Sequence, residues 1–200
     1  MSSTTIDSLL HENRRFPPTA AFVANAIAPP SIYDAAAANR LEFWANRARA
    51  LHWHTPFTET LDWSGAPVAR WFADGEINVA YNCLDRHVEA GLGNRVAIQF
   101  EGEPGDSRTI TYRELTDEVC KAANLLTSLG VGHGDRVAIY MPLIPEAIVA
   151  MLACARVGAI HSVVFGGFAA ESLRARIEDA EAKLVITADG GFRKGTVFNL

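Results

Sequence analysis

Regular patterns of apolar and polar positions run from about residue 78 to residue 187. Short apolar runs bounded by turn residues predict strands at 95–100, 109–111, 137–141, 160–165 and 184–187. Apolar residues spaced three and four apart predict helices at 80–90, 112–129, 145–157 and 170–181. Strands that alternate with helices across short links indicate an α/β fold of βα repeats. We expect a mostly parallel sheet with helices on both faces.

Local signals fix several of these boundaries. Thr111 and Glu114 have the spacing of a capping box at a helix start. Pro145 suits the first turn of the next helix, and Gly130 and Gly158 suit helix ends.

The first eighty residues have a different character, because they hold all four tryptophans and most of the prolines. Ser31 is expected to cap a helix through about Leu51, and Asp74-Gly75 predicts a turn between two short strands. The predicted apolar face of that helix is Leu41, Trp44, Ala48 and Leu51. We expect residues 1–80 to form a helical, tryptophan-rich covering segment. Residues 81–200 are expected to be the first part of a larger domain, truncated soon after the last strand.

Composition narrows the function classes. The chain is 49% hydrophobic and 20% charged, which favours a packed core. Its net charge of −5 argues against nucleic-acid binding. No signal peptide is visible in residues 1–16, and no apolar run reaches the ~20 residues of a membrane helix. Cys83, Cys120 and Cys154 are expected to be buried free thiols, so we expect a cytoplasmic protein.

Two glycine-containing loops are candidates for an anion site. Gly166-Gly167 follows a predicted strand and precedes a helix, and the next strand leads into a loop with Arg193 and Lys194. Loops after consecutive parallel strands emerge at one edge of a sheet, where ligands collect. Backbone N–H groups and two cations there suit a phosphate. The alternatives are a tight strand-to-helix turn at Gly166-Gly167 and a solvated basic turn at Arg193-Lys194.

Other polar groups do not form a recognisable site. Gly130–Asp135 follows a helix and precedes a strand, the reverse of a dinucleotide-binding order. His52 and His54 lack a third metal ligand, so no metal site is predicted. No site for nucleophilic catalysis is predicted either, since His87 and His161 have no nearby Cys, Ser or acidic residue in the sequence that suggests one. An acidic loop is interpreted as a solvated hairpin end; its members are Glu101, Glu103 and Asp106.

Longer sequence blocks resemble the AMP-forming acetyl-coenzyme A synthetases, which are adenylate-forming ligases. The blocks are Asn82–His87, Phe100–Glu103, Thr111–Leu115, Tyr140–Phe168 and Val185–Gly191. The resemblance implies that ATP and acetate form an acetyl-adenylate and pyrophosphate with Mg²⁺, and that coenzyme A then displaces AMP. The implied small-molecule partners are therefore acetate, ATP and coenzyme A.

The resemblance also implies roles for the two loops. Arg193, Lys194, Gly195 and Thr196 correspond to the loop that binds the 3′-phosphate end of coenzyme A, and Gly166 and Gly167 to a segment lining the same nucleotide. Thr196 stands where the family often has a second arginine, and Ala169 where it commonly has a capping serine.

The family's phosphate loop, Mg²⁺ site, acyl pocket and C-terminal domain have no counterpart within these 200 residues. The resemblance thus implies no catalytic residue in this chain, which is expected to be inactive alone. A propionate-CoA ligase fragment, a non-catalytic coenzyme A-binding fragment and an unstable chain remain alternatives. The sequence does not indicate the oligomeric state.

Overall fold

The computed structural model describes residues 14–167 and 169–200. The prediction that residues 1–16 contain no signal peptide falls mostly outside the described residues. Phe168, the last residue of the block 140–168, also lies outside them. The chain divides into two compact units, one through Ala48 and one from Arg49 onward. No helix among the described residues is long and apolar enough to cross a membrane.

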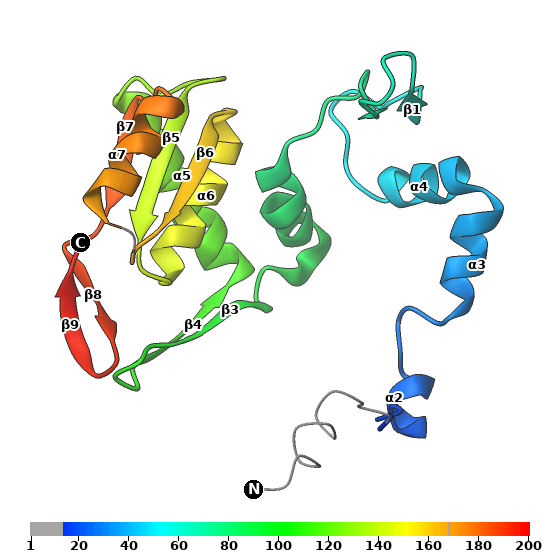
Figure 1. Ribbon diagram of the computed structural model, residues 1–200, viewed down its shortest axis with the longest axis horizontal. Helices are drawn as coiled ribbons and strands as arrows, with labels where there is room; N and C mark the ends of the chain where they lie inside the picture. Colours follow the sequence, from blue (N-terminus) through cyan, green and yellow to red (C-terminus); the bar gives the residue numbers. More distant parts are fainter. Residues whose placement is uncertain (1–13, 168) are drawn as a thin grey trace, which may run out of the picture. The chain divides into compact units, whose positions relative to one another are not determined.

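Short helices make up the first unit: α2 (Ala20–Ala24), α3 (Ser31–Ala38) and α4, which runs from Arg40 to Arg49 (Figure 1). The single helix predicted from Ser31 to Leu51 is wrong, because Asn39 is non-helical and its side-chain oxygen accepts the Glu42 N–H, which starts a new helix. Ser31 is the first helical residue and not the cap.

The predicted apolar face of that helix is also wrong in part. Ala45 and Ala48 are buried, whereas Leu41, Trp44 and Leu51 are nearly half exposed. In α4 the buried positions are therefore the small alanines, and its bulkier apolar residues remain partly in solvent.

Residues 49–78 are mainly irregular. Strand β1 (Leu61–Asp62) pairs antiparallel with β2 (Arg70–Trp71), and the second of the two short strands predicted around Asp74-Gly75 does not form at residues 77–79. The turn itself is present, and the Asp74 carboxylate accepts hydrogen bonds from the N–H and hydroxyl of Thr58 at 2.7 and 2.5 Å. Before residue 79, the described part of the segment predicted to be helical and tryptophan-rich is helical only at α2, α3 and α4, and of its four tryptophans only Trp44 lies on a helix.

The predicted helix at 80–90 is present and contains two π-helical stretches, η1 (Tyr81–Asp85) and η2 (Val88–Leu92). Strands β3 (Val96–Glu101) and β4 (Ser107–Thr111) then form an antiparallel hairpin. Helix α5 (Tyr112–Ser128) begins at the predicted capping box, in which the Thr111 and Glu114 side chains each bond the other's backbone N–H.

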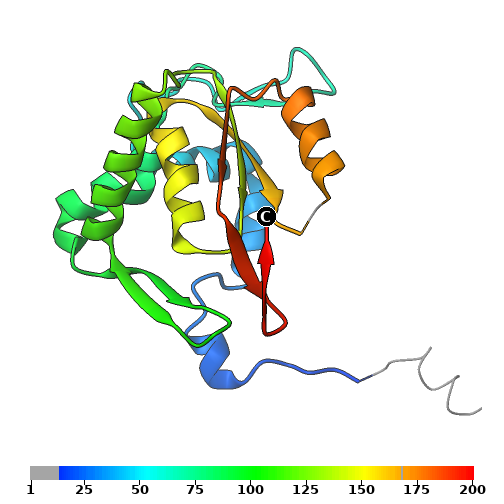
Figure 2. The same cartoon turned by 90° about the vertical axis from the view of Figure 1, so that its left-hand side faces the viewer.

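A three-stranded parallel sheet forms the centre of the second unit, in the order β6 (Ile160–Phe165), β5 (Arg136–Met141), β7 (Leu184–Thr187). The connections through α6 (Pro145–Val157) and α7 (Ala170–Asp179) run in opposite directions across β5. Since both crossovers are expected to be right-handed, the two helices lie on opposite faces, as Figures 1 and 2 show. This part of the predicted α/β architecture is confirmed.

The core lies between the sheet and the α5–α6 layer. It includes the buried residues Leu115, Val119, Leu126, Val137, Ile139, Ala153 and Cys154. Cys83 is exposed and Cys120 half-buried, so the expectation of three buried thiols holds for Cys154 alone, although all three are free.

The sheet is less extensive than predicted. Among the described strands only β5, β6 and β7 pair in parallel. Residues after β7 form an antiparallel hairpin of β8 (Gly190–Arg193) and β9 (Thr196–Asn199). Its two turn residues, Lys194 and Gly195, both have positive φ (54° and 76°), as in the tight turns that match strand twist.

Candidate functional site

A cleft of about 870 Å³ opens at the carboxyl ends of the parallel strands. Its walls come from the β3–β4 hairpin, the β5–α6 loop, Gly166-Gly167 and the β8–β9 hairpin. This is the edge at which ligands collect in open α/β sheets, and the volume suits a small-molecule site.

Gly167 and Arg193 meet in this cleft. A side-chain carbon placed on Gly167 would lie 2.9 Å from an Arg193 guanidinium nitrogen and 2.7 Å from the Phe165 ring. One on Gly166 would lie 3.3 Å from the Met141 carbonyl oxygen. The two loops therefore lie at one sheet edge, as their order in the sequence predicted. Glycine at 167 leaves room for the guanidinium against bare backbone.

The other residues of the basic loop are placed differently. Arg193 lines the cleft, whereas Lys194, Gly195 and Thr196 form the end of the β8–β9 hairpin without lining it. The Thr196 hydroxyl donates to the Arg193 carbonyl at 3.1 Å, which closes the turn on itself. The structure thus brings Arg193, Gly166 and Gly167 together in the cleft wall, whereas Lys194 lies in the hairpin turn next to Arg193.

Glu103 is a residue whose position the sequence did not reveal. Its carboxylate accepts a hydrogen bond from the Gly195 N–H, across the tips of the two hairpins. Glu103 is an exposed residue of the hairpin end, as interpreted from the sequence, and it also has this partner on the second hairpin. The one sequence signal for this contact is that Glu103 belongs to the polar loop between β3 and β4, which lines the same cleft.

Among the described residues that line the cleft, Arg108 and Arg193 are the only cations. Arg108 forms an ion pair with Glu146 in the first turn of α6. Burial acts to raise the pKa of Glu146, but the hydrogen bond and the charge of Arg108, together with a backbone hydrogen bond, outweigh it and the pKa is lowered. Arg108 is therefore committed to a carboxylate, whereas Arg193 has no ion-pair partner in the described part of the chain.

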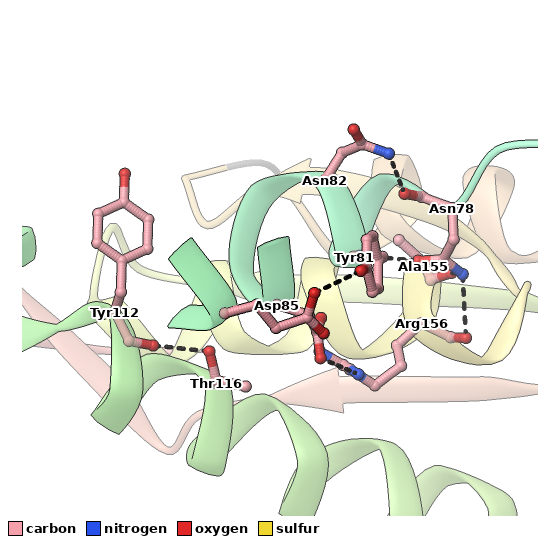
Figure 3. Close-up of polar contacts among 9 residues, drawn as sticks. Asn78, Tyr81, Asn82, Asp85, Tyr112, Thr116, Ala155 and Arg156 are labelled. Atoms are coloured by element: carbon pink, nitrogen blue, oxygen red, sulfur yellow. Dashed lines mark hydrogen bonds and ion pairs between the residues drawn. The ribbon is translucent and has the colours of Figure 1, made fainter. Parts of the chain in front are cut away.

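A polar network fixes the helix at 79–92 to the end of α6 (Figure 3). The Asn78 amide donates to the carbonyls of Ala155 and Arg156 at 3.1 and 3.3 Å. Arg156 donates twice to the Asp85 carboxylate, at 3.2 and 2.6 Å. Because α6 starts at the cleft, this network supports the cleft from the far end of the helix.

One of the two histidines that flank Trp53 packs against an aromatic ring. His52 stacks on Tyr81 at 4.4 Å between ring centroids, and its backbone N–H donates to the Asn82 side chain. Residues 14–167 and 169–200 contain no group of three or more His, Cys, Asp or Glu that could hold a metal ion.

Two models of known protein families match this chain. Residues 84–197 match the family model described as AMP-binding enzyme. The chain belongs to the AMP-binding enzyme family. Residues 30–83 match a second model, acetyl-coenzyme A synthetase N-terminus, so the border between the two models falls within the helix at 79–92.

Curated relatives of this family member are similar over nearly all of its length. The acetyl-coenzyme A synthetase of Streptomyces avermitilis is 67% identical over 98% of the chain, and that of Mycolicibacterium smegmatis is 67% identical over 92%. The enzyme of the same name from Gemmatimonas aurantiaca is 56% identical over 98% of the chain. The chain spans 30%, 20% and 30% of these three relatives, respectively.

Proposed function

We propose that this chain is the N-terminal part of an acetate–CoA ligase, which converts ATP, acetate and coenzyme A to acetyl-CoA, AMP and pyrophosphate through an acetyl-adenylate. The identity of 67% to an acetyl-coenzyme A synthetase supports this activity over a propionate-CoA ligase. Residues 1–80 are proposed as a segment preceding the first part of the AMP-binding domain, residues 81–200. Mg²⁺ is proposed as the metal of the complete enzyme.

The observation that carries a role for this chain is the meeting of Arg193 and Gly167 in the cleft. A guanidinium that lies against bare backbone at a sheet edge suits a phosphate, because its fork donates two parallel hydrogen bonds. We assign this place to the nucleotide end of coenzyme A. Arg193 and Lys194 hold the 3′-phosphate, Gly195 and Thr196 shape the turn that presents them, and Gly166 and Gly167 let the nucleotide approach.

These 200 residues are proposed to bind without catalysing. Adenylation develops negative charge at the α-phosphate, and preorganised cations and donors must stabilise it. Of the two cations among the described cleft residues, Arg108 is already paired with Glu146. We therefore assign no catalytic residue here. ATP-dependent release of AMP by the pure chain, above that of a mock preparation, would contradict this.

Two further properties follow from the proposed substrates. Acetate, ATP and coenzyme A are soluble metabolites, so a cytoplasmic location is proposed. The acidic net charge of −5 supports small-molecule partners over nucleic acid.

Binding of coenzyme A to the chain by isothermal titration calorimetry tests the proposal. Replacing both Arg193 and Lys194 by alanine should weaken binding by about tenfold or more, because charge-assisted hydrogen bonds are lost. Dephospho-coenzyme A, which lacks the 3′-phosphate, should bind weakly to the parent chain and be little affected by the double substitution. Arg174→Ala, at an exposed position on α7, is the matched control. Equal affinities of coenzyme A for parent and double variant would refute the assignment.

A further inference from the structure

The tips of the β3–β4 and β8–β9 hairpins lie side by side, as the views in Figures 1 and 2 agree, and both hairpins contribute residues to the wall of the cleft. The contact is a hydrogen bond from the Gly195 N–H to the Glu103 carboxylate, between residues 92 positions apart. One hairpin presents the acidic β3–β4 loop, and the other presents the turn that follows Arg193.

The group that Glu103 contacts is suited to an anion. Lys194 and Gly195 both have positive φ, and the backbone N–H of Gly195 points out of the turn to the carboxylate. Backbone N–H groups in turns form binding sites for anions, phosphates among them. Two cations precede this N–H in the sequence, Arg193 and Lys194.

Glu103 contacts the backbone of this turn and not its cations. Neither Arg193 nor Lys194 forms an ion pair with Glu103 among the described residues. The carboxylate therefore places a negative charge at the turn that follows the two cations in the sequence, and it occupies the Gly195 N–H of that turn. An arriving phosphate meets both a repelling charge and an occupied N–H.

We propose that Glu103 is an internal competitor of the ligand phosphate, which holds the tip of the β8–β9 hairpin until a phosphomonoester displaces it. This inference rests on the proposed function, because it concerns the regulation of the same phosphate site. It makes Glu103 a determinant of affinity, and the β3–β4 loop a latch that the ligand opens.

Substitution by glutamine separates charge from hydrogen bonding. The amide oxygen of Glu103→Gln still accepts from the Gly195 N–H but no longer repels a phosphate. Removing one charge next to the site should tighten binding by about fivefold at low salt, and the gain should shrink as salt screens it. Glu101→Gln is the matched control, since Glu101 lines the same cleft without a hydrogen bond to the hairpin among the described residues.

The probe is adenosine 3′,5′-bisphosphate, titrated by calorimetry into the 200-residue chain and its variants at 50 and 300 mM salt (about 14 and 6 Å of screening length). Tighter binding by Glu103→Gln, with a clearly smaller change in Glu101→Gln, is the expected result. Tighter binding by Glu103→Gln and none by the parent chain also supports the inference.

Three other outcomes would overturn it. Equal gains in both variants would show a general effect of charge, and weaker binding by Glu103→Gln would show that Glu103 positions the hairpin for its ligand. Bisphosphate binding that depends on Arg193 but is unchanged in Glu103→Gln would refute the latch and leave the proposed function standing. Binding by no variant would refute the proposed function together with the latch.

Discussion

The ion pair between Asp85 and Arg156 is expected to couple the helix at 79–92 to α6. Two hydrogen bonds, at 3.2 and 2.6 Å, join the guanidinium fork to the carboxylate. The side chains are only 22% and 23% exposed, respectively, so water screens the pair less than it would on the surface. Replacing either partner by alanine leaves the other charge mostly buried without its counterion.

The expected coupling energy of this pair lies between the values for exposed and for buried ion pairs. Exposed ion pairs contribute about 0.2–1 kcal/mol, and removing one partner of a buried pair costs about 3–5 kcal/mol. A bidentate pair that is about four-fifths buried should therefore show a coupling energy of about 2 kcal/mol.

Urea unfolding of Asp85→Ala, Arg156→Ala and the double variant gives the coupling energy from a double-mutant cycle. The matched control is the i,i+4 pair Arg174–Glu178 on α7, whose side chains are 78% and 64% exposed. Its coupling should be about 0.3–0.5 kcal/mol. An Asp85–Arg156 coupling no larger than the control value would refute the reasoning from burial and geometry.

Three further predictions concern a cap, a turn and a thiol. Thr111→Ala removes the hydroxyl cap of α5 and should lower the free energy of unfolding in urea by about 1 kcal/mol. Gly158→Ala should cost more than about 1 kcal/mol in the same assay, because φ is +75° and the added carbon would lie 2.8 Å from the His133 ring. Burial raises the pKa of Cys154 from 9.0 to about 11. The unfolded chain therefore releases this proton at lower pH than the folded chain, so stability should fall from pH 9 to 11 and less so in Cys154→Ala. At pH 8 a thiol reagent should modify exposed Cys83 and spare Cys154.

Each of these three predictions has a control within the same chain. Ser128→Ala removes an exposed hydroxyl that donates back to Leu125, and it should change stability by less than about 0.5 kcal/mol. Gly132→Ala meets nothing within 4 Å and should be tolerated, unlike Gly158→Ala. Equal losses in either comparison would contradict the cap or the turn argument. Modification of Cys154 at pH 8 as fast as that of Cys83 would contradict the burial argument.

The sequence predicted helix and strand boundaries correctly where the residues that fix a boundary are close together in the chain. The capping box at Thr111, the proline that starts α6 and the glycine that ends it act within one helical turn, and all three lie where the sequence predicted. Strand β7, at 184–187, was predicted to the residue, because a short apolar run between turns has few alternatives.

Predictions failed where a distant partner or a side-chain cap decided the outcome. Asn39 ended one helix and began another through its own side chain, which the apolar spacing around it does not reveal. Arg70–Trp71 paired with Leu61–Asp62, which lie before it in the chain, and not with the segment beyond Asp74.

The sequence by itself determined the order of helices and strands from β3 to β7, the resemblance to acetyl-coenzyme A synthetases, and the shared sheet edge of its two glycine-containing loops. The tertiary structure alone decided what faces what at that edge. It set Arg193 against Gly167, and Glu103 against Gly195 92 residues away. The physical reason is that side-chain spacing governs contacts within one element, whereas contacts between hairpin tips depend on how far each hairpin reaches and how it twists.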